Sequence, residues 1–326
     1  MIGQHPADLG GHGGGGPTEH ANPTETQMED FTNTHILVGE FELIEPHTLA
    51  QASESLRTHA GEAVIMAGGT DLLVGMKMEH IRTKYVISLG RISALKRVDT
   101  NSDLVIGATA SIRDVAHNSV VRQQYCALAE ACQSFSTMQI MVMGTVGGNL
   151  CNASPAADTA PALLALDASV HLTSGVRERE IALSEFFTGP GGTVLSDGEV
   201  LEHISVPAPS LSTGSAFLKM GRVAADISKV SVAVTVVRSE DRVRQCRIAL
   251  GAVASTPRRI VAAESELLGE KPTISGISKV SQLVQQAIEP ITDVRSTAAY
   301  RRHLAGVLVG DAFRQAWLRA GGGEIT

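Results

Sequence analysis

The middle of the chain reads Gly144-Thr145-Val146-Gly147-Gly148-Asn149, and an earlier stretch reads Ala67-Gly68-Gly69-Thr70-Asp71. The earlier stretch lies between a predicted buried strand at 64–67 and a predicted short helix at 71–77. Paired glycines permit positive φ angles and let a backbone approach a ligand closely. Successive backbone N–H groups in such turns form a concave phosphate site, and a nearby helix N-terminus adds partial positive charge. Two such loops could therefore hold one pyrophosphate between them.

Each glycine loop also has a plainer interpretation, because a Gly-Gly pair is most often simply a turn. Polar residues follow the second loop closely, namely Asn149, Asn152, Ser154 and Asp158. Such side chains suit the ribose hydroxyls of a dinucleotide. They are equally suited to local turns and helix caps, and Asp158 could cap the helix predicted near Pro161. From the residues alone, both interpretations of the loops stay open.

The pattern of apolar residues around the two loops predicts an α+β protein. We predict strands at 64–67, 86–89, 104–106, 170–173, 201–206, 215–220, 229–238 and 244–255. Helices are predicted at 71–77, 111–117, 123–132, 161–166, 257–268, 277–288 and 297–317. In the last helix Leu304, Val307, Leu308 and Ala312 share one face, which indicates packing on that face. Mixed strands and helices followed by one sheet and then helices are typical of the α+β class.

The N-terminal stretch differs in composition from the rest of the chain. Residues 1–34 are rich in Gly, Pro, Thr and Glu, which predicts a disordered tail. Its Gly11, Gly13 and Gly16 match G-x-G-x-x-G, but no strand precedes them and no helix follows, so a dinucleotide fingerprint is rejected. We expect a first domain at 35–212, with subdomains at about 35–90 and 91–212, and a C-terminal α+β domain at 213–326.

Charge and hydropathy exclude several classes of function. The net charge is −7 and no basic stripe is present, which argues against nucleic-acid binding. No apolar run reaches the roughly 18 residues of a membrane span, and we recognise no signal peptide, so we expect a cytoplasmic protein with no integral membrane segment. The four cysteines are scattered without a C-x-x-C pair, so we expect buried thiols and no metal site.

The two loops together resemble a known family, the FAD-binding medium subunits of the molybdenum hydroxylases, which include xanthine dehydrogenase and carbon monoxide dehydrogenase. The resemblance rests on Ala67–Leu72, on Gly144–Leu150 and on Ala153–Asp158. It covers roughly residues 36 to 320 and includes the stretches Lys219–Lys229 and Tyr300–Leu304. The two loops in this order and spacing are specific to the family, and the other stretches support them.

The resemblance implies a fold and a cofactor site. The expected fold is a two-subdomain FAD-binding domain of the vanillyl-alcohol-oxidase-like type, followed by a C-terminal domain with a sheet and helices. The expected cofactor is non-covalent FAD, bound by Ala67, Gly68, Gly69, Thr70, Asp71, Phe135, Thr145, Val146, Gly147, Gly148, Asn149, Asp158, Leu201 and Lys219. Within this set the two loops would hold the pyrophosphate. No catalytic residue and no metal ligand is expected in this chain.

Four of these positions carry individual roles by resemblance. Asp158 matches a position that contacts the FAD ribose, and Phe135 matches an aromatic residue that packs on the cofactor. Leu201 and Lys219 match positions near the flavin ring system. Simple burial in the core is the alternative role for Phe135 and Leu201, and solvent exposure is the alternative for Lys219.

The chain departs from the family at one place. Many members have polar or basic residues directly before the second loop, whereas this chain has Met141, Val142 and Met143. Polar contacts at these positions are therefore not expected here. The backbone of the loop is unaffected by the difference.

The resemblance also implies an electron-transfer function within a complex. A molybdenum cofactor in a large subunit would oxidise the substrate, and [2Fe-2S] clusters in a small subunit would relay the electrons. The flavin of this chain would pass them to an external acceptor. The expected partners form a heterotrimer with this chain, commonly doubled. The substrate and the acceptor are not revealed, because the substrate pocket would lie in another chain.

Two other functions stay open at this point. One is a freestanding FAD-dependent oxidoreductase of the same fold, which would need its own substrate-binding residues. The other is a nucleotide-binding or regulatory module without redox chemistry. A visible absorption spectrum distinguishes the second from the first, because only a flavoprotein is yellow.

Overall fold

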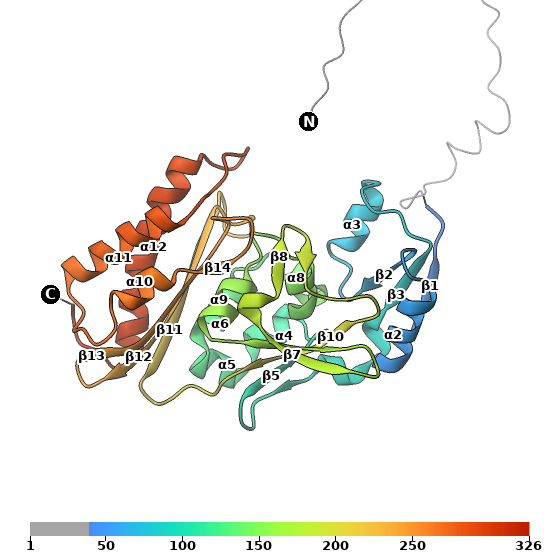
Figure 1. The fold of residues 1–326 in the computed structure, drawn as a ribbon, viewed down its shortest axis with the longest axis horizontal. Helices are drawn as coiled ribbons and strands as arrows, with labels where there is room; N and C mark the ends of the chain where they lie inside the picture. The colour runs from blue at the N-terminus through green and yellow to red at the C-terminus, as the bar shows by residue number, and fades with distance from the viewer. Residues whose placement is uncertain (1–38, 326) are drawn as a thin grey trace, which may run out of the picture. The chain divides into compact units, whose positions relative to one another are not determined.

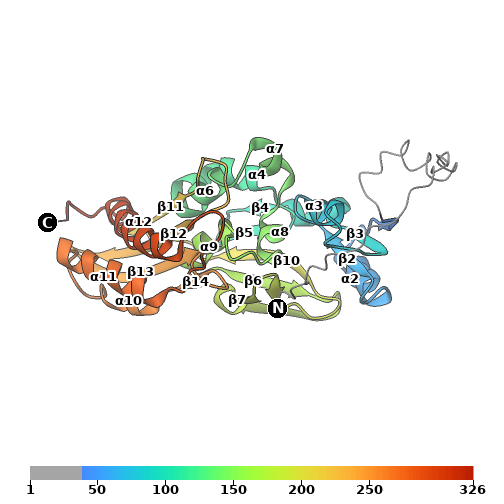
Figure 2. The ribbon, with the colours of Figure 1, turned by 90° about the horizontal axis from the view of Figure 1, so that it is seen from above.

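The computed structural model describes residues 39–325. The predicted tail at 1–34, with Gly11, Gly13 and Gly16, lies outside the described residues. Figure 1 and Figure 2 show the described part as three larger sheets with helices packed beside them. No helix within residues 39–325 is long and apolar enough to cross a membrane.

The first sheet is parallel and has three strands in the order β1-β3-β2. Its elements are β1 (Glu42–Ile44), α2 (Leu49–Thr58), β2 (Ala63–Met66), α3 (Leu72–Lys77) and β3 (Tyr85–Ser88). Parallel neighbours need crossover connections, and α2 and α3 provide them. The first glycine loop, residues 67–71, therefore leaves the carboxyl end of β2, which is where α/β sheets usually bind ligands.

The central sheet has five strands in the order β4-β5-β10-β6-β7, all with antiparallel neighbours. The strands are β4 (Val98–Asp99), β5 (Leu104–Gly107), β6 (Ser169–Thr173), β7 (Glu178–Ala182) and β10 (Val200–Val206). The helices beside it are α4 (Ile112–His117), α5 (Ser119–Gln124), α6 (Cys126–Gln133), α7 (Met138–Met143), α8 (Val146–Cys151) and α9 (Thr159–Ala165). A hairpin of β8 (Phe187–Gly189) and β9 (Gly192–Thr193) and the short 3₁₀ helices at Leu89–Arg91, Ser93–Lys96 and Leu183–Glu185 complete this part.

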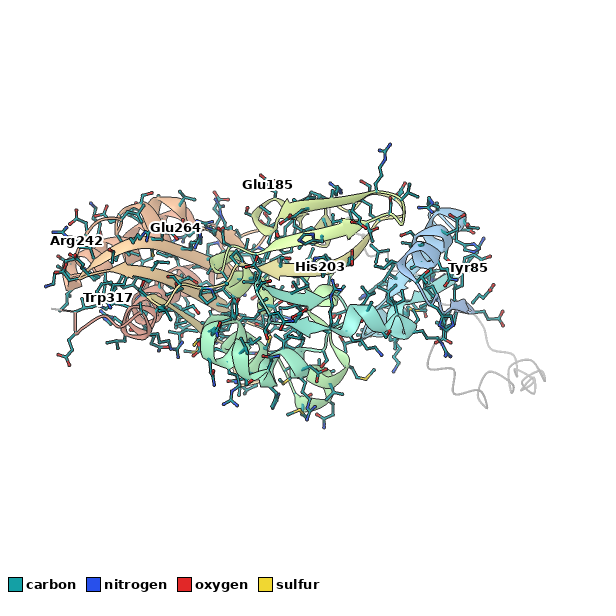
Figure 3. All side chains as sticks on the ribbon, turned by 90° about the horizontal axis from the view of Figure 1, so that it is seen from below. Tyr85, Glu185, His203, Arg242, Glu264 and Trp317 are labelled. Atoms are coloured by element: carbon teal, nitrogen blue, oxygen red, sulfur yellow. The ribbon has the colours of Figure 1, made fainter. Side chains whose placement is uncertain are left out.

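The two faces of the central sheet differ. Ile106 of β5 and Ile204 of β10 are fully buried, and they pack into one core with residues of the helices, such as Leu128 of α6. The rings of His171 of β6 and His203 of β10 stack with centroids 4.0 Å apart. His203 is labelled in Figure 3. Burial and the neighbouring His171 lower the pKa of His203 to about 4, so His203 is neutral at neutral pH.

The C-terminal part is an antiparallel sheet covered by helices. The strands are β11 (Thr213–Met220), β12 (Val230–Ser239), β13 (Arg242–Gly251) and β14 (Arg258–Arg259). The helices are α10 (Val261–Ser265), α11 (Ile274–Ala287) and α12 (Ala298–Arg319). Leu304, Leu308 and Ala312 of α12 face the core formed with β12, as predicted, but Val307 is exposed, so its predicted place on this face is wrong. Trp317 near the end of α12 is buried in the same core (Figure 3).

The structure confirms the α+β class, with the parallel and central sheets and their helices followed by a sheet covered by helices. We propose that the two domains divide in segment 207–212, which connects β10 to β11. The parts share packing across this division, because Phe217 of β11 joins the core of the central sheet. A division of the first domain near residue 90, after the parallel sheet, also remains a proposal.

Three predicted elements are wrong in detail. The helix predicted at 257–268 is the strand β14, paired with β13, followed by the five-residue helix α10. The strand predicted to reach residue 255 ends at Gly251, because Ala252 adopts a φ of 60°. The helix predicted at 123–132 is two helices, α5 and α6, which meet at the buried Tyr125.

Candidate functional site

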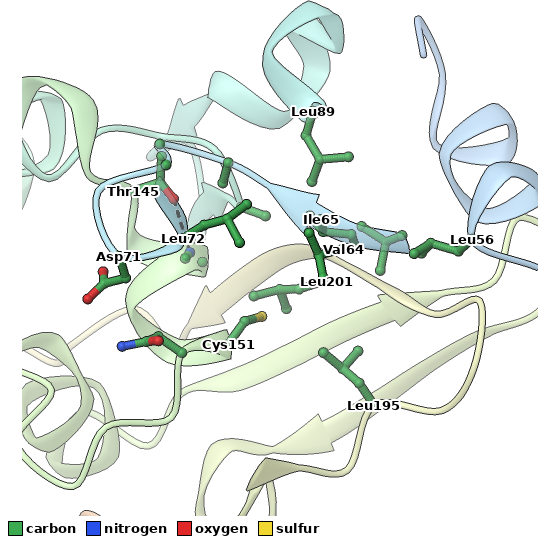
Figure 4. Close-up of a pocket in the computed structure, with 18 of the residues that line it drawn as sticks. Leu56, Val64, Ile65, Asp71, Leu72, Leu89, Thr145, Cys151, Leu195 and Leu201 are labelled. Carbon is green, nitrogen blue, oxygen red and sulfur yellow. Dashed lines mark hydrogen bonds between the residues drawn. The ribbon is translucent and has the colours of Figure 1, made fainter. Parts of the chain in front are cut away.

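A cavity of about 510 Å³ lies between the parallel sheet and the central sheet (Figure 4). Its volume falls in the range of about 300–1,000 Å³ that is usual for small-molecule sites. The cavity brings together most of the residues expected to bind a cofactor, namely Ala67, Gly68, Gly69, Thr70, Asp71, Phe135, Thr145, Gly147, Gly148, Asn149 and Leu201. Val146, Asp158 and Lys219 are expected residues that do not line it.

The cavity has a polar side and an apolar side. Asp71 and Thr145 lie on the left of Figure 4, and Leu56 and Leu195 lie on the right. The apolar lining is formed by Leu56, Val64, Ile65, Leu89, Leu195 and Leu201. Such a site can accept a molecule with a flat apolar ring at one end and a charged group among the glycine loops.

The first glycine loop has a backbone conformation and a close contact that only glycine permits. A Cβ on Gly68 would overlap the carbonyl oxygen of Met143, so the loop lies directly against the end of α7. Gly69 has a φ of 72°, a conformation that L side chains rarely adopt. The backbone N–H groups of Gly68, Gly69, Thr70 and Asp71 have no hydrogen-bond partner among residues 39–325. They are therefore available to an anionic ligand.

The second glycine segment differs from its prediction, because most of it is helical. Thr145 caps α8, and its Oγ1 accepts a hydrogen bond of 3.0 Å from the N–H of Gly148. The N–H groups of Val146 and Gly147 donate to the carbonyl oxygens of Ala110 and Ala108 at 3.1 Å each. The amides of Gly144 and of residues 146–149 are thus paired within the protein, and among residues 144–149 only the N–H of Thr145, which lines the cavity, has no partner within residues 39–325.

Gly147 shows why this wall needs glycine. A Cβ on Gly147 would lie 2.5 Å from the carbonyl oxygen of Ala108, closer than side chains can approach. The side chain of Val146 points the other way and is fully buried in the core. Gly147 therefore serves packing within the protein, and Val146 contributes a buried apolar side chain to the core.

The polar residues after the second segment divide into two roles. Asn149 caps α9. Its Oδ1 accepts one hydrogen bond of 3.2 Å from the N–H of Thr159 and another of 2.6 Å from the hydroxyl Oγ1 of Thr159. Asp158 precedes α9 but makes no side-chain cap hydrogen bond. The capping role considered for Asp158 is therefore filled by Asn149.

Asp158 instead forms a buried ion pair with Lys219. The Lys219 Nζ lies 2.8 Å from Oδ2 of Asp158 and also donates to the carbonyl oxygen of Ser134 at 3.0 Å. The side chains of Asp158 and Lys219 are only 9% and 4% exposed, so the solvated position considered for Lys219 is wrong. The Oδ1 of Asp158 is buried and has no hydrogen-bond partner among residues 39–325. Burial outweighs the attraction of Lys219 and raises the pKa of Asp158 to about 6.

Phe135 and Leu201 both pack on the core and both line the cavity, so neither of their alternative roles is excluded. Leu201 is 3% exposed and belongs to the core of the central sheet, yet it also lines the cavity. Phe135 is partly buried against the same core and lines the cavity beside Gly144, where a Cβ on Gly144 would lie 3.6 Å from its ring.

Several lining residues were missed by sequence reasoning. The segment 195–199 before β10 forms part of the wall, and Cys151 of α8 lines it as well. The following Asn152, which the sequence had singled out as a possible ribose contact, also lines the cavity. The signal at 195–199 was a turn of Ser196-Asp197-Gly198, in which Gly198 has a φ of 77°. A turn signal alone says nothing about what the turn faces, so this part of the site could not be predicted.

The site fits a dinucleotide such as FAD on two structural grounds. The free amides of residues 68–71 suit a pyrophosphate. The apolar wall suits a ring system. Among residues 39–325, no three His, Cys, Asp or Glu side chains are grouped to hold a metal ion.

Comparison with protein families matches almost the whole described chain. The family "FAD binding domain in molybdopterin dehydrogenase" matches residues 39–209. The family "CO dehydrogenase flavoprotein C-terminal domain" matches residues 215–316.

Individual relatives agree with these matches. The carbon monoxide dehydrogenase medium chain of Hydrogenophaga pseudoflava is 31% identical over 280 residues, covering 86% of this chain and 98% of the relative. The xanthine dehydrogenase FAD-binding subunit of Escherichia coli O157:H7 is 29% identical over 279 residues, covering 84% and 95%. A solved structure of carbon monoxide dehydrogenase from Hydrogenophaga pseudoflava superposes with a TM-score of 0.84, covering 86% of this chain and 98% of the matched chain.

Proposed function

This chain belongs to the family of FAD-binding medium subunits of molybdenum hydroxylases, and we propose that it binds one FAD non-covalently in the cavity of Figure 4. The observation that carries the proposal is the loop at residues 67–71, which lines a cavity with an apolar wall and whose amides at residues 68–71 have no partner within residues 39–325. Bound FAD would supply the redox chemistry, and the protein would supply binding and orientation.

The proposed contacts divide among the residues around the cavity. The N–H groups of Gly68 to Asp71 would donate to the pyrophosphate, with Gly148 leaving room on the opposite wall. Phe135 would pack on the cofactor, and Leu201 would contact it from β10. Asp158 and Lys219 would act from behind the wall, through the unpartnered Oδ1 and the ammonium charge.

We further propose that the chain transfers electrons inside a complex with a large molybdenum-cofactor subunit and a small [2Fe-2S] subunit. Electrons would pass from the clusters of the small subunit to the cofactor of this chain, and then to an external acceptor. The printed names of relatives support this role, because they are medium chains or FAD-binding subunits of dehydrogenases. A heterotrimer, commonly doubled, is the expected assembly.

A surface beside the cavity supports the choice of partner. The apolar side chains of Val74, Met78, Met138, Val142 and Met143 are each about half exposed or more. We call these side chains of α3 and α7 the α3/α7 surface. Both helices flank the first glycine loop, since α3 follows it directly and the end of α7 contacts Gly68. Exposed apolar side chains beside the cofactor site would be covered by a partner, so we assign this surface to the iron–sulfur subunit. Apolar side chains of this kind are typical of the centre of protein interfaces.

The cysteines support an assignment of the clusters to the partner. Cys126 and Cys132 lie on α6, Cys151 on α8 and Cys246 on β13, and all are free thiols. Burial raises the pKa of Cys151 to about 12, which opposes the thiolate form that a cluster needs. Free thiols also suit a reducing compartment, and we include a cytoplasmic location in the proposal.

The proposal is tested by cofactor analysis of the purified full-length chain. We expect a yellow protein with one FAD per chain, released into the supernatant by acid precipitation, and essentially no iron or acid-labile sulfide. A colourless protein that fails to take up FAD would contradict flavin binding. Flavin that stays with the precipitate would contradict non-covalent binding, and stoichiometric iron with sulfide would contradict the assignment of the clusters.

A further inference from the structure

The turn at residues 195–199 forms a wall at the apolar end of the cavity. All of its residues line the cavity, and its Leu195 lies at the same end as Leu56 (Figure 4). The turn belongs to no helix or strand, since β9 ends at Thr193 and β10 begins at Val200. A connecting segment of this kind is mobile unless its neighbours hold it, so the contacts around it decide whether the wall exists before a ligand arrives.

Arg179 of β7 holds this turn through three hydrogen bonds. Its Nε donates to Oε1 of Glu199 at 2.7 Å, and its Nη2 donates to Oε2 of Glu199 at 2.6 Å. The same Nη2 donates to the carbonyl oxygen of Val194 at 2.7 Å. A bidentate pair of arginine and carboxylate is strong and fixes the geometry of both groups. The guanidinium therefore fastens the chain at both ends of the turn.

The carboxylate of Glu199 carries this restraint into the turn itself. Its Oε2 accepts a hydrogen bond of 2.8 Å from the N–H of Ser196, and the N–H of Glu199 donates to the carbonyl oxygen of Ser196 at 3.0 Å. The side chain of Glu199 is only 12% exposed. The hydrogen bond from Arg179 is the main cause that lowers the pKa of Glu199, so the pair is ionised at neutral pH.

Helix α2 of the parallel sheet contacts the turn as well. Gly198 has a φ of 77°, and a Cβ on it would lie 2.8 Å from Cγ of Arg57 on α2. The Nη1 of Arg57 donates to the carbonyl oxygen of Ser174, in the connection between β6 and β7, at 2.7 Å. The turn is thus bonded to β7 and in contact with α2, which lie in the two parts that enclose the cavity.

We propose that Arg179 is a positioning residue for the cofactor, which holds the turn at 195–199 in place as a wall of the apolar end before FAD binds. The inference rests on the proposed function. Arg179 does not line the cavity, so it acts through Glu199 and Val194 and not through contact with FAD. A wall that is formed in advance spares the complex the entropy loss of ordering the turn, and this raises affinity.

The first test is hydrogen exchange of the deflavinated full-length chain, followed by mass spectrometry of peptides that cover residues 194–200. Without FAD, Arg179→Gln should exchange there at least about tenfold faster than wild type, because the N–H of Ser196 loses its fixed acceptor. Saturating FAD should slow this exchange again, and peptides of α12 should exchange as in wild type. Arg314→Gln is the matched control, because Arg314 is 45% exposed, compared with 40% for Arg179, and pairs with Asp311 on α12. At residues 194–200 this control should exchange like wild type.

The second test is the dissociation constant of FAD, measured by flavin fluorescence. Arg179→Gln should raise it about tenfold, and Arg314→Gln should leave it unchanged. Arg179→Lys keeps the positive charge but cannot form the bidentate contact, so it should also weaken binding. Wild-type affinity in Arg179→Lys would assign the effect to charge and not to position, and would overturn the inference.

Two further results would also overturn it and leave FAD binding intact. One is equal exchange at residues 194–200 in wild type and Arg179→Gln, and the other is unchanged FAD affinity in Arg179→Gln. No FAD binding by wild type would overturn the proposed function itself. The exchange rates without FAD would then still show whether Arg179 holds the turn.

Discussion

At the scale of single residues, a substitution at Gly148 can test FAD binding without preventing the protein from folding. A Cβ added to Gly148 would lie 2.7 Å from Oγ1 of Thr145, and the next atom, the Cβ of Ala67, is 3.8 Å away. A larger side chain would therefore extend into the cavity that Gly148 lines. We predict that Gly148→Val folds and weakens FAD binding at least about a hundredfold, which is about 2.7 kcal/mol. Flavin content and titration with FAD measure the effect.

The chain offers a matched control for this substitution. Gly276 has the same position in α11, where its N–H donates to Oγ1 of the capping Thr273 at 3.1 Å. Gly276→Val removes a glycine from the same place in a helix but far along the chain from the cavity residues, so FAD binding should be unchanged. Full flavin occupancy in Gly148→Val would exclude the cavity as the FAD site.

The sequence predicted the two glycine loops, but it did not predict which of them has unpaired backbone N–H groups. The pairing of Val146 and Gly147 amides with Ala110 and Ala108 depends on a contact between segments about 40 residues apart, which spacing does not reveal. The Asp158–Lys219 pair joins residues 61 apart in the chain, and its burial is likewise a tertiary property. Glycine patterns predict where a backbone can approach a ligand, and packing decides which amides stay free.

At the scale of elements, helix α12 is tied to the sheet by a buried arginine. Arg301 is 3% exposed and donates to the carbonyl oxygen of Lys229 at 2.8 Å and to Oδ1 of Asp293 at 2.7 Å. Removal of one partner from a buried pair leaves the other charge and carbonyl groups without their donor. We predict that Arg301→Ala lowers the free energy of unfolding by about 3–5 kcal/mol, measured by urea denaturation.

An exposed pair on the same helix provides the comparison. Arg314 and Asp311 are 3.1 Å apart, and their side chains are 45% and 51% exposed. Arg314→Ala should change the free energy of unfolding by less than about 1 kcal/mol. Equal effects of the two substitutions would show that burial of Arg301 does not contribute to stability.

The elements that sequence patterns predicted well are those with a regular apolar period or a clear cap. Helix α4 begins as predicted, because Oγ of Ser111 accepts a hydrogen bond from the N–H of Asp114. The helix predicted at 257–268 failed because Arg258 and Arg259 pair with β13, and Arg259 forms an ion pair with Glu264 of α10. Helical propensity is a local property, so it cannot predict that residues 258–259 pair with the distant strand β13.

Helix α7 was missed for a different reason. Its sequence, Met138–Met143, is almost wholly apolar, yet only Met141 is buried. A helix of a protein that acts alone would place polar residues on its outer face. A partner that covers the exposed side of α7 would explain why its sequence does not alternate between apolar and polar faces.

At the scale of the whole molecule, a substitution on the exposed α3/α7 surface should weaken the proposed complex and leave the fold intact. Met143 is 58% exposed and lies at the edge of the first glycine loop. We predict that Met143→Lys weakens assembly with the iron–sulfur subunit about tenfold or more, because a charge would be buried in an apolar interface. Pull-down affinity between the separately purified subunits measures this.

The control for assembly is Val261→Lys. Val261 is an apolar residue of α10 that is 62% exposed and belongs to the C-terminal domain. This substitution should leave assembly and FAD content unchanged. Equal binding by wild type and Met143→Lys would assign the partner to a different face of the chain.

The central claim is that this chain passes electrons that arrive from a partner and does not oxidise the hydroxylated substrate itself. The most direct measurement follows flavin absorbance near 450 nm under anaerobic conditions. The FAD-loaded chain is mixed either with its pre-reduced iron–sulfur subunit or with candidate heterocycles, aldehydes and carbon monoxide in the absence of partners. We predict rapid bleaching by the reduced partner and no bleaching by the candidate substrates. Bleaching at catalytic speed by a substrate alone would contradict the account and identify a freestanding flavoenzyme.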